Sequence, residues 1–241
     1  MRIAVLGVGL IGGSIGLAAR GRLQGAEVAG WDPDGRRLDS AEELGAVSSG
    51  HDTLAEAVTG SEVVFCAAPV GALPELAAEA LSAADEDAAI TDVGSVKGDA
   101  VAALGGDPRF IGGHPLAGAE TSGVENARAD LFEGARWYLT PTPSTGGVLY
   151  DRVQGMIADL GARPQAIGAA EHDRLMATVS HLPHVLANVL VDQAADSLGA
   201  EQDGERLPEM GPSFRDATRV AGANPSLWGD IFAGNREAVA T

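Results

Sequence analysis

A glycine-rich turn between two apolar segments constrains the fold of this chain more than any other feature. The turn reads Gly7-Val8-Gly9-Leu10-Ile11-Gly12, after the apolar run Arg2–Leu6 and before a helix-compatible stretch that ends at Arg20. A second apolar run, Glu27–Trp31, ends directly before Asp32. A strand, a glycine turn, a helix and a second strand ending in an acidic residue form the fingerprint of a dinucleotide-binding fold.

Each residue of the turn has a physical task in such a site. Gly7 permits the tight turn, Gly9 lets the pyrophosphate approach the backbone, and Gly12 lets the helix pack on the strand. Leu10-Ile11 open the helix, whose free amides and dipole favour the phosphates. Asp32 follows Gly12 by twenty residues, where a carboxylate can hydrogen-bond both ribose hydroxyls. These residues are the predicted cofactor contacts.

Asp32 also bears on which dinucleotide the site takes. Its negative charge repels a 2′-phosphate, which favours NAD over NADP. Arg36 and Arg37 follow closely and keep NADP open, although two arginines at the start of a helix are more often solvated. The predicted cofactor is NAD, with NADP as the second choice.

Strand and helix patterns continue to alternate beyond Asp32. Strands are expected at five further places, with helices between them at residues 72–82, 97–104 and 147–160; the strands are at 62–68, 88–93, 109–111, 136–139 and 163–167. Such alternation predicts an α/β fold with a Rossmann-like doubly wound sheet whose ligands lie at the carboxyl ends of the strands. The expected domains are a dinucleotide-binding domain, 1–168, and a smaller all-helical domain for substrate binding and dimerisation, 169–241.

Residues 112–123 gather small residues around one imidazole, that of His114, and one carboxylate, that of Glu120. His114 has an unperturbed pKa near neutrality, which suits a proton acceptor. Taken alone, the segment could be a glycine-rich surface turn. It follows an expected strand, as residues 92–97 do, so both segments are predicted at the cofactor edge. The glycines are expected to leave room for another molecule beside His114.

The helical half carries an apolar stripe with polar residues set into it. The stripe recurs every three or four residues and is expected to face the core; it consists of Leu175, Val179, Leu182, Leu186 and Leu190. Pro183 is expected to kink this helix and free a carbonyl. Trp228 and Phe232 are expected to pack in the core.

Three histidines in this half, His172, His181 and His184, raise the question of a metal. No carboxylate or cysteine stands at ligand spacing, so no metal is predicted. Structural histidines, or a pocket role for at least one of them, remain alternatives. The helix expected at 214–221 carries arginines and an aspartate, which suit either a solvated face or a fork for a carboxylate ligand.

Composition excludes several kinds of partner. The net charge of −18 argues against nucleic acid and against anionic membrane surfaces. The only cysteine, Cys66, lies in an apolar run, which predicts a buried structural thiol and no disulfide framework. The apolar stretch 3–19 contains five glycines and is short for a membrane span. A cytoplasmic protein is expected.

Five motifs in one order resemble the prephenate/arogenate dehydrogenase family, from residue 1 to about residue 237. They are the Gly7 fingerprint, Asp92-Val93-Gly94-Ser95-Val96-Lys97, residues 112–123, Ser180-His181-Leu182-Pro183-His184 and residues 214–221. The Gly-Gly-His-Pro and Ser-His-Leu-Pro-His motifs are specific to this family. The resemblance implies NAD(P)-dependent oxidative decarboxylation in tyrosine biosynthesis, of prephenate to 4-hydroxyphenylpyruvate or of arogenate to tyrosine.

The resemblance also implies roles for individual residues. His114 accepts the proton of the ring hydroxyl while hydride leaves that carbon, and Ser95 hydrogen-bonds the hydroxyl or His114. Arg219 pairs with a substrate carboxylate. The pocket is shaped by Glu120, His184 and Asp216. The helical domain is expected to form a homodimer.

Two positions depart from the family pattern. Ser213 stands where members often have glycine, and the chain ends soon after residue 237, where members usually continue with helices that help form the dimer.

Other functions are weighed against this one. An arogenate-preferring enzyme, a dual-specificity cyclohexadienyl dehydrogenase or one acting on an amino analogue of prephenate is the runner-up. A hydroxyacid dehydrogenase would rely on a lysine in its helical domain, and the only lysine, Lys97, lies in the first half. A non-catalytic NAD-binding regulator is disfavoured because His114, Ser95 and Arg219 are all present.

Overall fold

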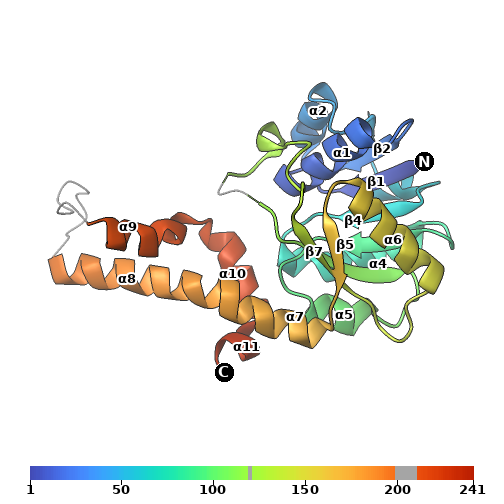
Figure 1. Ribbon diagram of the computed structural model, residues 1–241. Helices are drawn as coiled ribbons and strands as arrows, with labels where there is room; N and C mark the ends of the chain where they lie inside the picture. The colour runs from blue at the N-terminus through green and yellow to red at the C-terminus, as the bar shows by residue number, and fades with distance from the viewer. Residues whose placement is uncertain (119–120, 199–210) are drawn as a thin grey trace.

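The structure is a computed structural model that describes residues 1–118, 121–198 and 211–241. An eight-stranded sheet with helices on both faces forms one domain, and a helical arm projects from it (Figure 1). The strands are β1 (Arg2–Leu6), β2 (Glu27–Trp31), β3 (Ser49–Gly50), β4 (Val63–Cys66), β5 (Ala89–Asp92), β6 (Phe110–Pro115), β7 (Arg136–Thr140) and β8 (Arg163–Ala166).

The helices between the strands are α1 (Leu10–Arg22), α2 (Gly35–Glu43), α3 (Leu54–Val58), α4 (Leu73–Ala83), α5 (Gly98–Leu104) and α6 (Gly147–Asp159), with short 3₁₀ turns η1 (Val70–Ala72) and η2 (Val124–Asn126). The arm contains α7 (Ala169–Met176), the π-helical turn η3 (Ala177–His181), α8 (Leu182–Leu198), α9 (Pro212–Thr218), the 3₁₀ turn η4 (Arg219–Gly222), α10 (Pro225–Gly234) and α11 (Arg236–Val239).

The strand order β3-β2-β1-β4-β5-β6-β7-β8 is that of a doubly wound sheet. All neighbours pair in parallel except β6 and β7. The chain runs outward in one direction from β1 to β3, and then in the other direction from β4. The switch point between β1 and β4 is where a doubly wound sheet binds its ligand. The predicted fold class is confirmed, whereas the domain boundary at residue 168 stays a prediction.

Each face of the sheet is covered by helices, which explains why its strands are apolar throughout. Along β1, Ile3 and Val5 pack into one core with α1, α2 and α6. Ala4 and Leu6 point to the other face and pack with α3, α4 and α5. Successive side chains of a strand alternate between faces, so one short strand contributes to both cores.

Strand β6 changes its partner halfway along. Phe110 and Ile111 pair with β5 in parallel, and residues 112–115 pair with β7 antiparallel. The strand therefore runs past the end predicted at residue 111, and His114 stands within it. A side chain on Gly113 would come within 2.5 Å of the Asp92 carbonyl, and one on Gly112 would collide with Thr140. The expectation that these two glycines leave room for a ligand is wrong: they let β6 pack closely on its neighbours.

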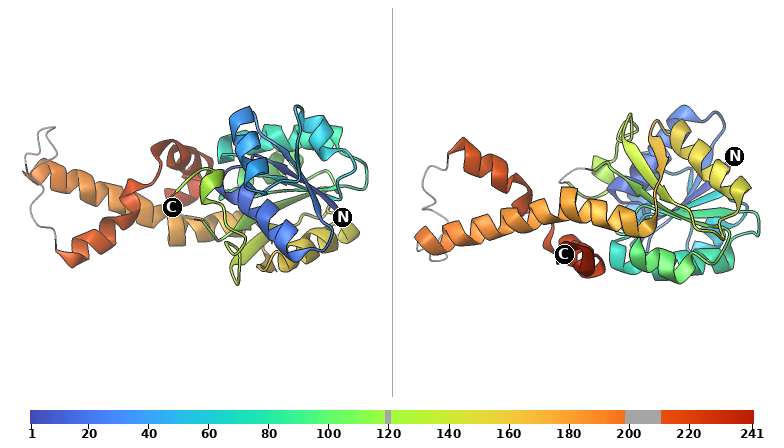
Figure 2. Two further views of the ribbon diagram at one scale, coloured as in Figure 1. Left: turned by 90° about the horizontal axis from the view of Figure 1, so that it is seen from above. Right: turned by 60° about the horizontal axis from the view of Figure 1, so that its bottom comes forward.

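Helices α7 and α8 run into each other through the wide turn η3, and the arm projects from the sheet domain in every view (Figures 1 and 2). Pro183 lies in the first turn of α8. Because proline has no N–H to donate, the wider turn just before it accommodates the missing hydrogen bond. The structure thus has a π-helical turn before Pro183, while the predicted kink stays a prediction.

Most of the apolar stripe of the arm does not face a core within the described part of the chain. The exposed fractions are 58% for Val179, 41% for Leu182, 54% for Leu186 and 42% for Leu190. The prediction of a core-facing stripe is wrong for these four, because α8 extends beyond the reach of the sheet domain. No helix in the described ranges is long and apolar enough to cross a membrane.

Candidate active site

The glycine turn lies at the carboxyl end of β1, at the switch point of the sheet. Gly7 has φ of +96°, a conformation that favours glycine, and donates its N–H to the Trp31 carbonyl at 2.8 Å. A side chain on Gly12 would collide with the Gly7 carbonyl, whereas one on Gly9 would meet nothing within 4 Å. The open space at Gly9 adjoins Leu10-Ile11, the start of α1, whose free amides favour an anion. This cradle fits a pyrophosphate.

Asp32 lies beside that turn with its side chain almost buried, at 3% exposed. One carboxylate oxygen accepts the Val8 N–H at 3.0 Å, and the other accepts the Asp34 N–H at 2.9 Å. Each oxygen keeps a further acceptor site for a ribose hydroxyl. Arg36 pairs with Asp34 at 3.1 Å, while an Arg37 nitrogen lies 3.9 Å from Asp32. The carboxylate thus keeps acceptor sites that suit ribose hydroxyls, and its charge disfavours a second phosphate.

A buried ion pair ties the end of β5 to β6. The Lys97 ammonium contacts the Asp92 carboxylate, and both side chains are fully buried. Lys97 also donates to the Gly113 carbonyl at 2.7 Å, and Asp92 accepts the Gly113 N–H at 3.0 Å. Burial lowers the pKa of Lys97, while the neighbouring Asp92 opposes that shift. The ion pair therefore fixes the backbone of β6 at Gly113, next to His114.

Ser95 stands on the segment between β5 and α5, and it is half-buried. Its neighbour Gly94 donates its N–H to Asp92 at 2.8 Å. The same carboxylate therefore holds the segment that carries Ser95 and the strand that carries His114.

His114 is buried, with 9% of its surface exposed. Its Nδ1 lies 2.9 Å from Nε2 of His172, whose Nδ1 lies 2.8 Å from Oδ1 of Asp173. Burial lowers the pKa of His114 well below its usual range, and His172 and Lys97 add to the effect. The imidazole is therefore neutral at neutral pH, as a general base must be. Its Nδ1 faces His172, and its Nε2 makes no hydrogen bond to the residues that the structure describes.

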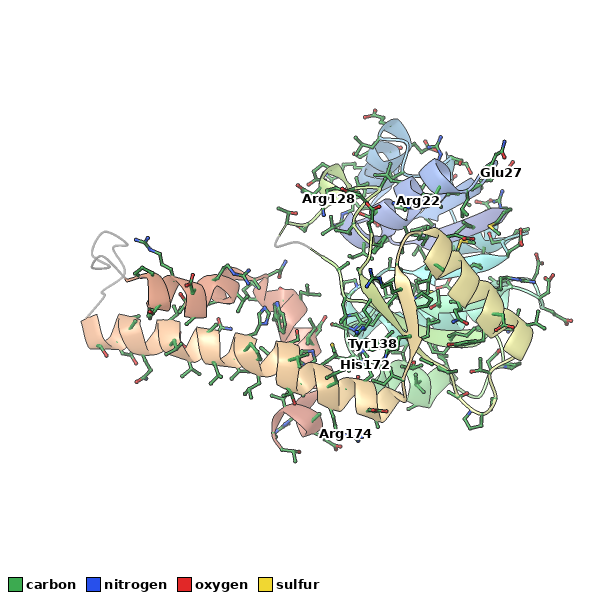
Figure 3. The ribbon with its side chains drawn as sticks, viewed as in Figure 1. Arg22, Glu27, Arg128, Tyr138, His172 and Arg174 are labelled. Carbon is green, nitrogen blue, oxygen red and sulfur yellow. The ribbon has the colours of Figure 1, made fainter. Side chains whose placement is uncertain are left out.

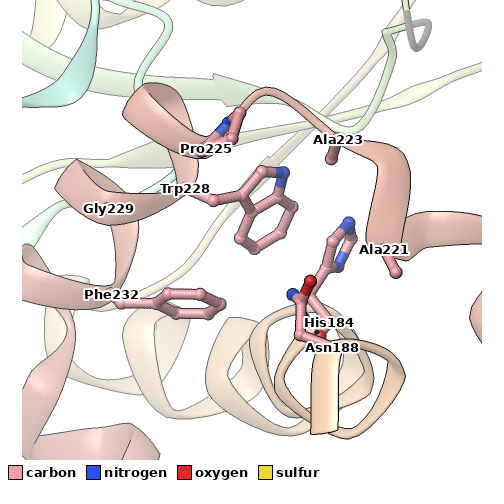
Figure 4. Close-up of a pocket in the computed structure, with 8 residues that line it drawn as sticks. All are labelled: His184, Asn188, Ala221, Ala223, Pro225, Trp228, Gly229 and Phe232. Atoms are coloured by element: carbon pink, nitrogen blue, oxygen red, sulfur yellow. Dashed lines mark hydrogen bonds between the residues drawn. The ribbon is translucent and has the colours of Figure 1, made fainter. Parts of the chain in front are cut away.

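The arm carries a small aromatic pocket of about 280 Å³. The rings of His184 and Trp228 stack with centroids 3.4 Å apart, and Phe232 lies 5.3 Å from Trp228 (Figure 4). The other lining residues are Asn188, Ala221, Ala223, Pro225 and Gly229. Trp228 and Phe232 thus line a pocket where the sequence predicted core packing.

Two more predicted site residues lie on the segment that packs along α8. Asp216 is exposed on α9, and Arg219 begins η4, two residues before Ala221 of the pocket wall. Glu120 lies outside the described residues.

The predicted site residues therefore fall into three groups: the cofactor cradle, the pair Ser95 and His114, and the pocket of the arm. The second and third are linked through Asn235, whose Nδ2 lies 2.8 Å from the Asp173 carbonyl and 3.0 Å from Nδ1 of His181. The His181 ring lies edge-on to Trp228 at 5.9 Å. Within the described part of the chain, no hydrogen bond or ring contact joins His114 directly to His184.

Sequence reasoning missed the partners of His114. His172 was considered as a metal ligand, a structural histidine or a pocket residue but not as a partner of His114, and Asp173 and Asn235 were not singled out. His114 and His172 are 58 positions apart, so no local pattern could connect them. Across residues 1–118, 121–198 and 211–241, no three His, Cys, Asp or Glu side chains are grouped to hold a metal.

The cradle, the acidic residue after β2 and the buried histidine at the neighbouring strand edge define a dinucleotide-binding class of protein. Comparison of the sequence with models of known protein families identifies the particular family. Residues 15–165 match "Prephenate dehydrogenase, nucleotide-binding domain", and residues 168–241 match "Prephenate dehydrogenase, dimerization domain". The chain belongs to the prephenate dehydrogenase family.

Individual relatives agree with the family models. The prephenate dehydrogenase of Bacillus subtilis is 34% identical over 98% of this chain, which spans 65% of that protein. The cyclohexadienyl dehydrogenase of Zymomonas mobilis is also 34% identical over 98% of the chain, and here 82% of the relative is covered. A crystal structure of Aquifex aeolicus prephenate dehydrogenase with hydroxyphenyl propionate and NAD+ is similar with a TM-score of 0.91 at 34% identity, over 100% of this chain and 84% of that one.

Proposed function

We propose that this chain is an NAD-dependent dehydrogenase that converts prephenate to 4-hydroxyphenylpyruvate by oxidative decarboxylation, in tyrosine biosynthesis. The observation that carries the proposal is His114: it is buried, neutral and hydrogen-bonded at Nδ1, with Nε2 left for a substrate. The family supports the reaction, and the bound NAD+ of the Aquifex relative supports the cofactor.

The chemistry needs a base that takes a proton and returns it. The hydroxyl proton of the substrate passes to Nε2 of His114 as the C–H bond of the same carbon breaks. NAD, when bound, supplies the acceptor for that hydride and becomes NADH. The bond to the ring carboxylate then breaks to release CO2, and its electron pair makes the ring aromatic. The ring oxygen takes the proton back from His114, so no net proton is released.

We assign the other predicted residues to the same reaction. Ser95, held beside the His114 strand by Asp92, hydrogen-bonds the reacting hydroxyl. Arg219 pairs with a substrate carboxylate, because an arginine fork matches a carboxylate in charge and geometry. The remaining residues that shape the substrate pocket are Glu120, His184 and Asp216. Gly7, Gly9, Gly12, Leu10-Ile11 and Asp32 hold the cofactor.

The active form is proposed to be a homodimer joined through the arm. Large apolar side chains remain 41–58% exposed along η3 and α8 in the single chain, and such a patch marks an interaction surface. The second family model is described as a dimerization domain. A second copy of the chain is therefore the partner that best accounts for the exposed stripe. The cytoplasmic location stays a prediction.

The direct test is to supply NAD and prephenate and to follow the absorbance of NADH. Parallel reactions with arogenate and with NADP distinguish the second candidate, an arogenate or dual-specificity cyclohexadienyl dehydrogenase, which the Zymomonas relative favours. NADH formation with prephenate supports the proposal. A flat trace with both substrates at saturating cofactor would contradict it.

A further inference from the structure

A hydrogen-bonded chain of side chains leads away from His114 into the protein interior. His114 on β6 contacts His172 on α7 at 2.9 Å, and His172 contacts Asp173 at 2.8 Å. His172 is fully buried, and Asp173 is 8% exposed. The ring of Tyr138, which stands opposite His114 on β7, packs edge-on against His172 at 5.7 Å (Figure 3).

Both carboxylate oxygens of Asp173 accept hydrogen bonds from main-chain N–H groups. Its Oδ1 accepts the Lys97 N–H at 2.9 Å, and its Oδ2 accepts the Gly98 N–H at 2.8 Å. Main-chain N–H groups can only donate, so both oxygens of Asp173 act as acceptors at the start of α5. The nitrogen of His172 that faces Asp173 must therefore carry a proton.

The direction of the remaining bond follows from that proton. A neutral imidazole has one donor and one acceptor nitrogen, so a neutral His172 with its proton on Nδ1 presents Nε2 as an acceptor. His114 must then donate from Nδ1. The lone pair of His114 is consequently on Nε2, for which the described residues provide no hydrogen-bond partner.

We propose that His172 and Asp173 are positioning residues for His114: they hold its proton on Nδ1, keep Nε2 basic, and compensate the positive charge that forms when His114 accepts the substrate proton. This inference rests on the proposed function for its kinetic consequences, but not for the hydrogen-bond arrangement itself. An acidic group behind an imidazole acts in this way in triads of the Ser-His-Asp type, where it orients the ring and stabilises the imidazolium. Here a second imidazole stands between the base and the carboxylate.

The charges around His114 agree with a compensating carboxylate. His172, Lys97 and His181 are the nearby groups of positive or potentially positive charge, and all three disfavour protonation of His114. The charge of Lys97 is already matched by Asp92. Asp173 is thus the carboxylate that can offset a cation at His114, through His172.

The tautomers of the histidines provide a test that needs no substrate. The chain has five histidines, so long-range ¹H–¹⁵N spectra of histidine-labelled protein can be assigned by single substitutions. We expect both His114 and His172 of the wild-type protein to carry their proton on Nδ1 at neutral pH. In His172→Phe, which cannot accept a hydrogen bond, His114 is expected to shift toward the Nε2–H form. A wild-type His114 with its proton on Nε2 would overturn the proposal.

Kinetics with a matched pair of variants test the same point. We expect His172→Phe to lower kcat by about 10–100-fold, as the loss of an orienting partner does, with little change in KM for prephenate. His172→Gln keeps an acceptor facing His114 and is expected to recover part of this loss. His51→Phe removes an imidazole whose partners are Ser49 and Arg2, away from His114, and should leave kcat close to wild type. A folded His172→Phe with wild-type kcat would refute a positioning role.

The two proposals can fail separately. If no substrate gives NADH but His114 carries its proton on Nδ1, the reaction is wrong and the positioning pair stands. If prephenate is oxidised while His114 carries its proton on Nε2, the reaction stands and the positioning pair is wrong.

Discussion

The sheet domain and the helical arm differ in the exposed fraction of their large apolar side chains. In the sheet domain, side chains such as Ile3, Phe65 and Leu139 are fully buried between helices of the same chain. In the arm, Leu186 and Leu190 remain about half exposed, at 54% and 42%. The sheet domain therefore has its own core, whereas the stripe of the arm stays exposed among the residues that the structure describes. Substitutions in the sheet domain should therefore alter kcat and cofactor binding, and substitutions in the stripe should alter dimerisation.

The largest effect is expected from the proposed base in the sheet domain. His114→Asn removes the group that accepts the proton, and kcat should fall by about 10²–10⁴-fold. The elution volume of the dimer in size-exclusion chromatography should not change. A variant with near-normal kcat would remove His114 from the role of base, and a monomeric variant would break the proposed separation of chemistry from assembly.

The next effect concerns the stripe of the arm. Leu186→Ala should raise the dissociation constant of the dimer by about 10²-fold, because a symmetric dimer loses the same buried surface twice. Analytical ultracentrifugation over a dilution series measures this constant. Val148→Ala is the matched control, since Val148 is 75% exposed on the sheet domain. Equal effects of both variants would contradict an interface through α8.

A smaller effect is expected at the cofactor site. Asp32→Asn should raise KM for NAD by about 10-fold, because hydrogen bonds to the charged carboxylate are replaced by weaker ones. Discrimination against NADP should also weaken, since the charge that repels a 2′-phosphate is lost. Asp34→Asn, which affects an exposed pair with Arg36, is the control and should change KM little. An unchanged KM in Asp32→Asn would exclude contact with the ribose.

The smallest effect is a pH dependence of stability at the junction of the two regions. Burial lowers the pKa of His181 from its usual 6.5 to about 4. The unfolded chain therefore binds the proton more readily, and stability is lost as the pH falls from about 6.5 toward 4. We expect Tm to fall by roughly 5 °C between pH 7 and pH 5 from this group. Calorimetry of His181→Gln should show a shallower decrease, and an unchanged pH dependence would show that His181 does not contribute.

The sequence predicted those parts of the molecule that depend on neighbouring residues. The turn from Gly7 to Gly12, the strand before it and Asp32 after β2 lie within one local unit, whose backbone geometry follows from glycine conformation and from alternating apolar patterns. The buried thiol of Cys66 was predicted for the same reason. A resemblance to known enzymes added the roles of Ser95, His114 and Arg219, which spacing alone could not assign.

Tertiary structure decided the contacts between distant segments. The change of partner along β6 places His114 inside a strand, and the docking of α7 brings His172 to its Nδ1. The stripe on α8 has the periodicity of a core helix, yet its surroundings make it exposed within one chain. Periodicity specifies which side of a helix is apolar but not what covers it. Local residue order therefore determined the dinucleotide-binding unit, whereas the environment of the base and the partner of the arm were set only by packing between elements far apart in the chain.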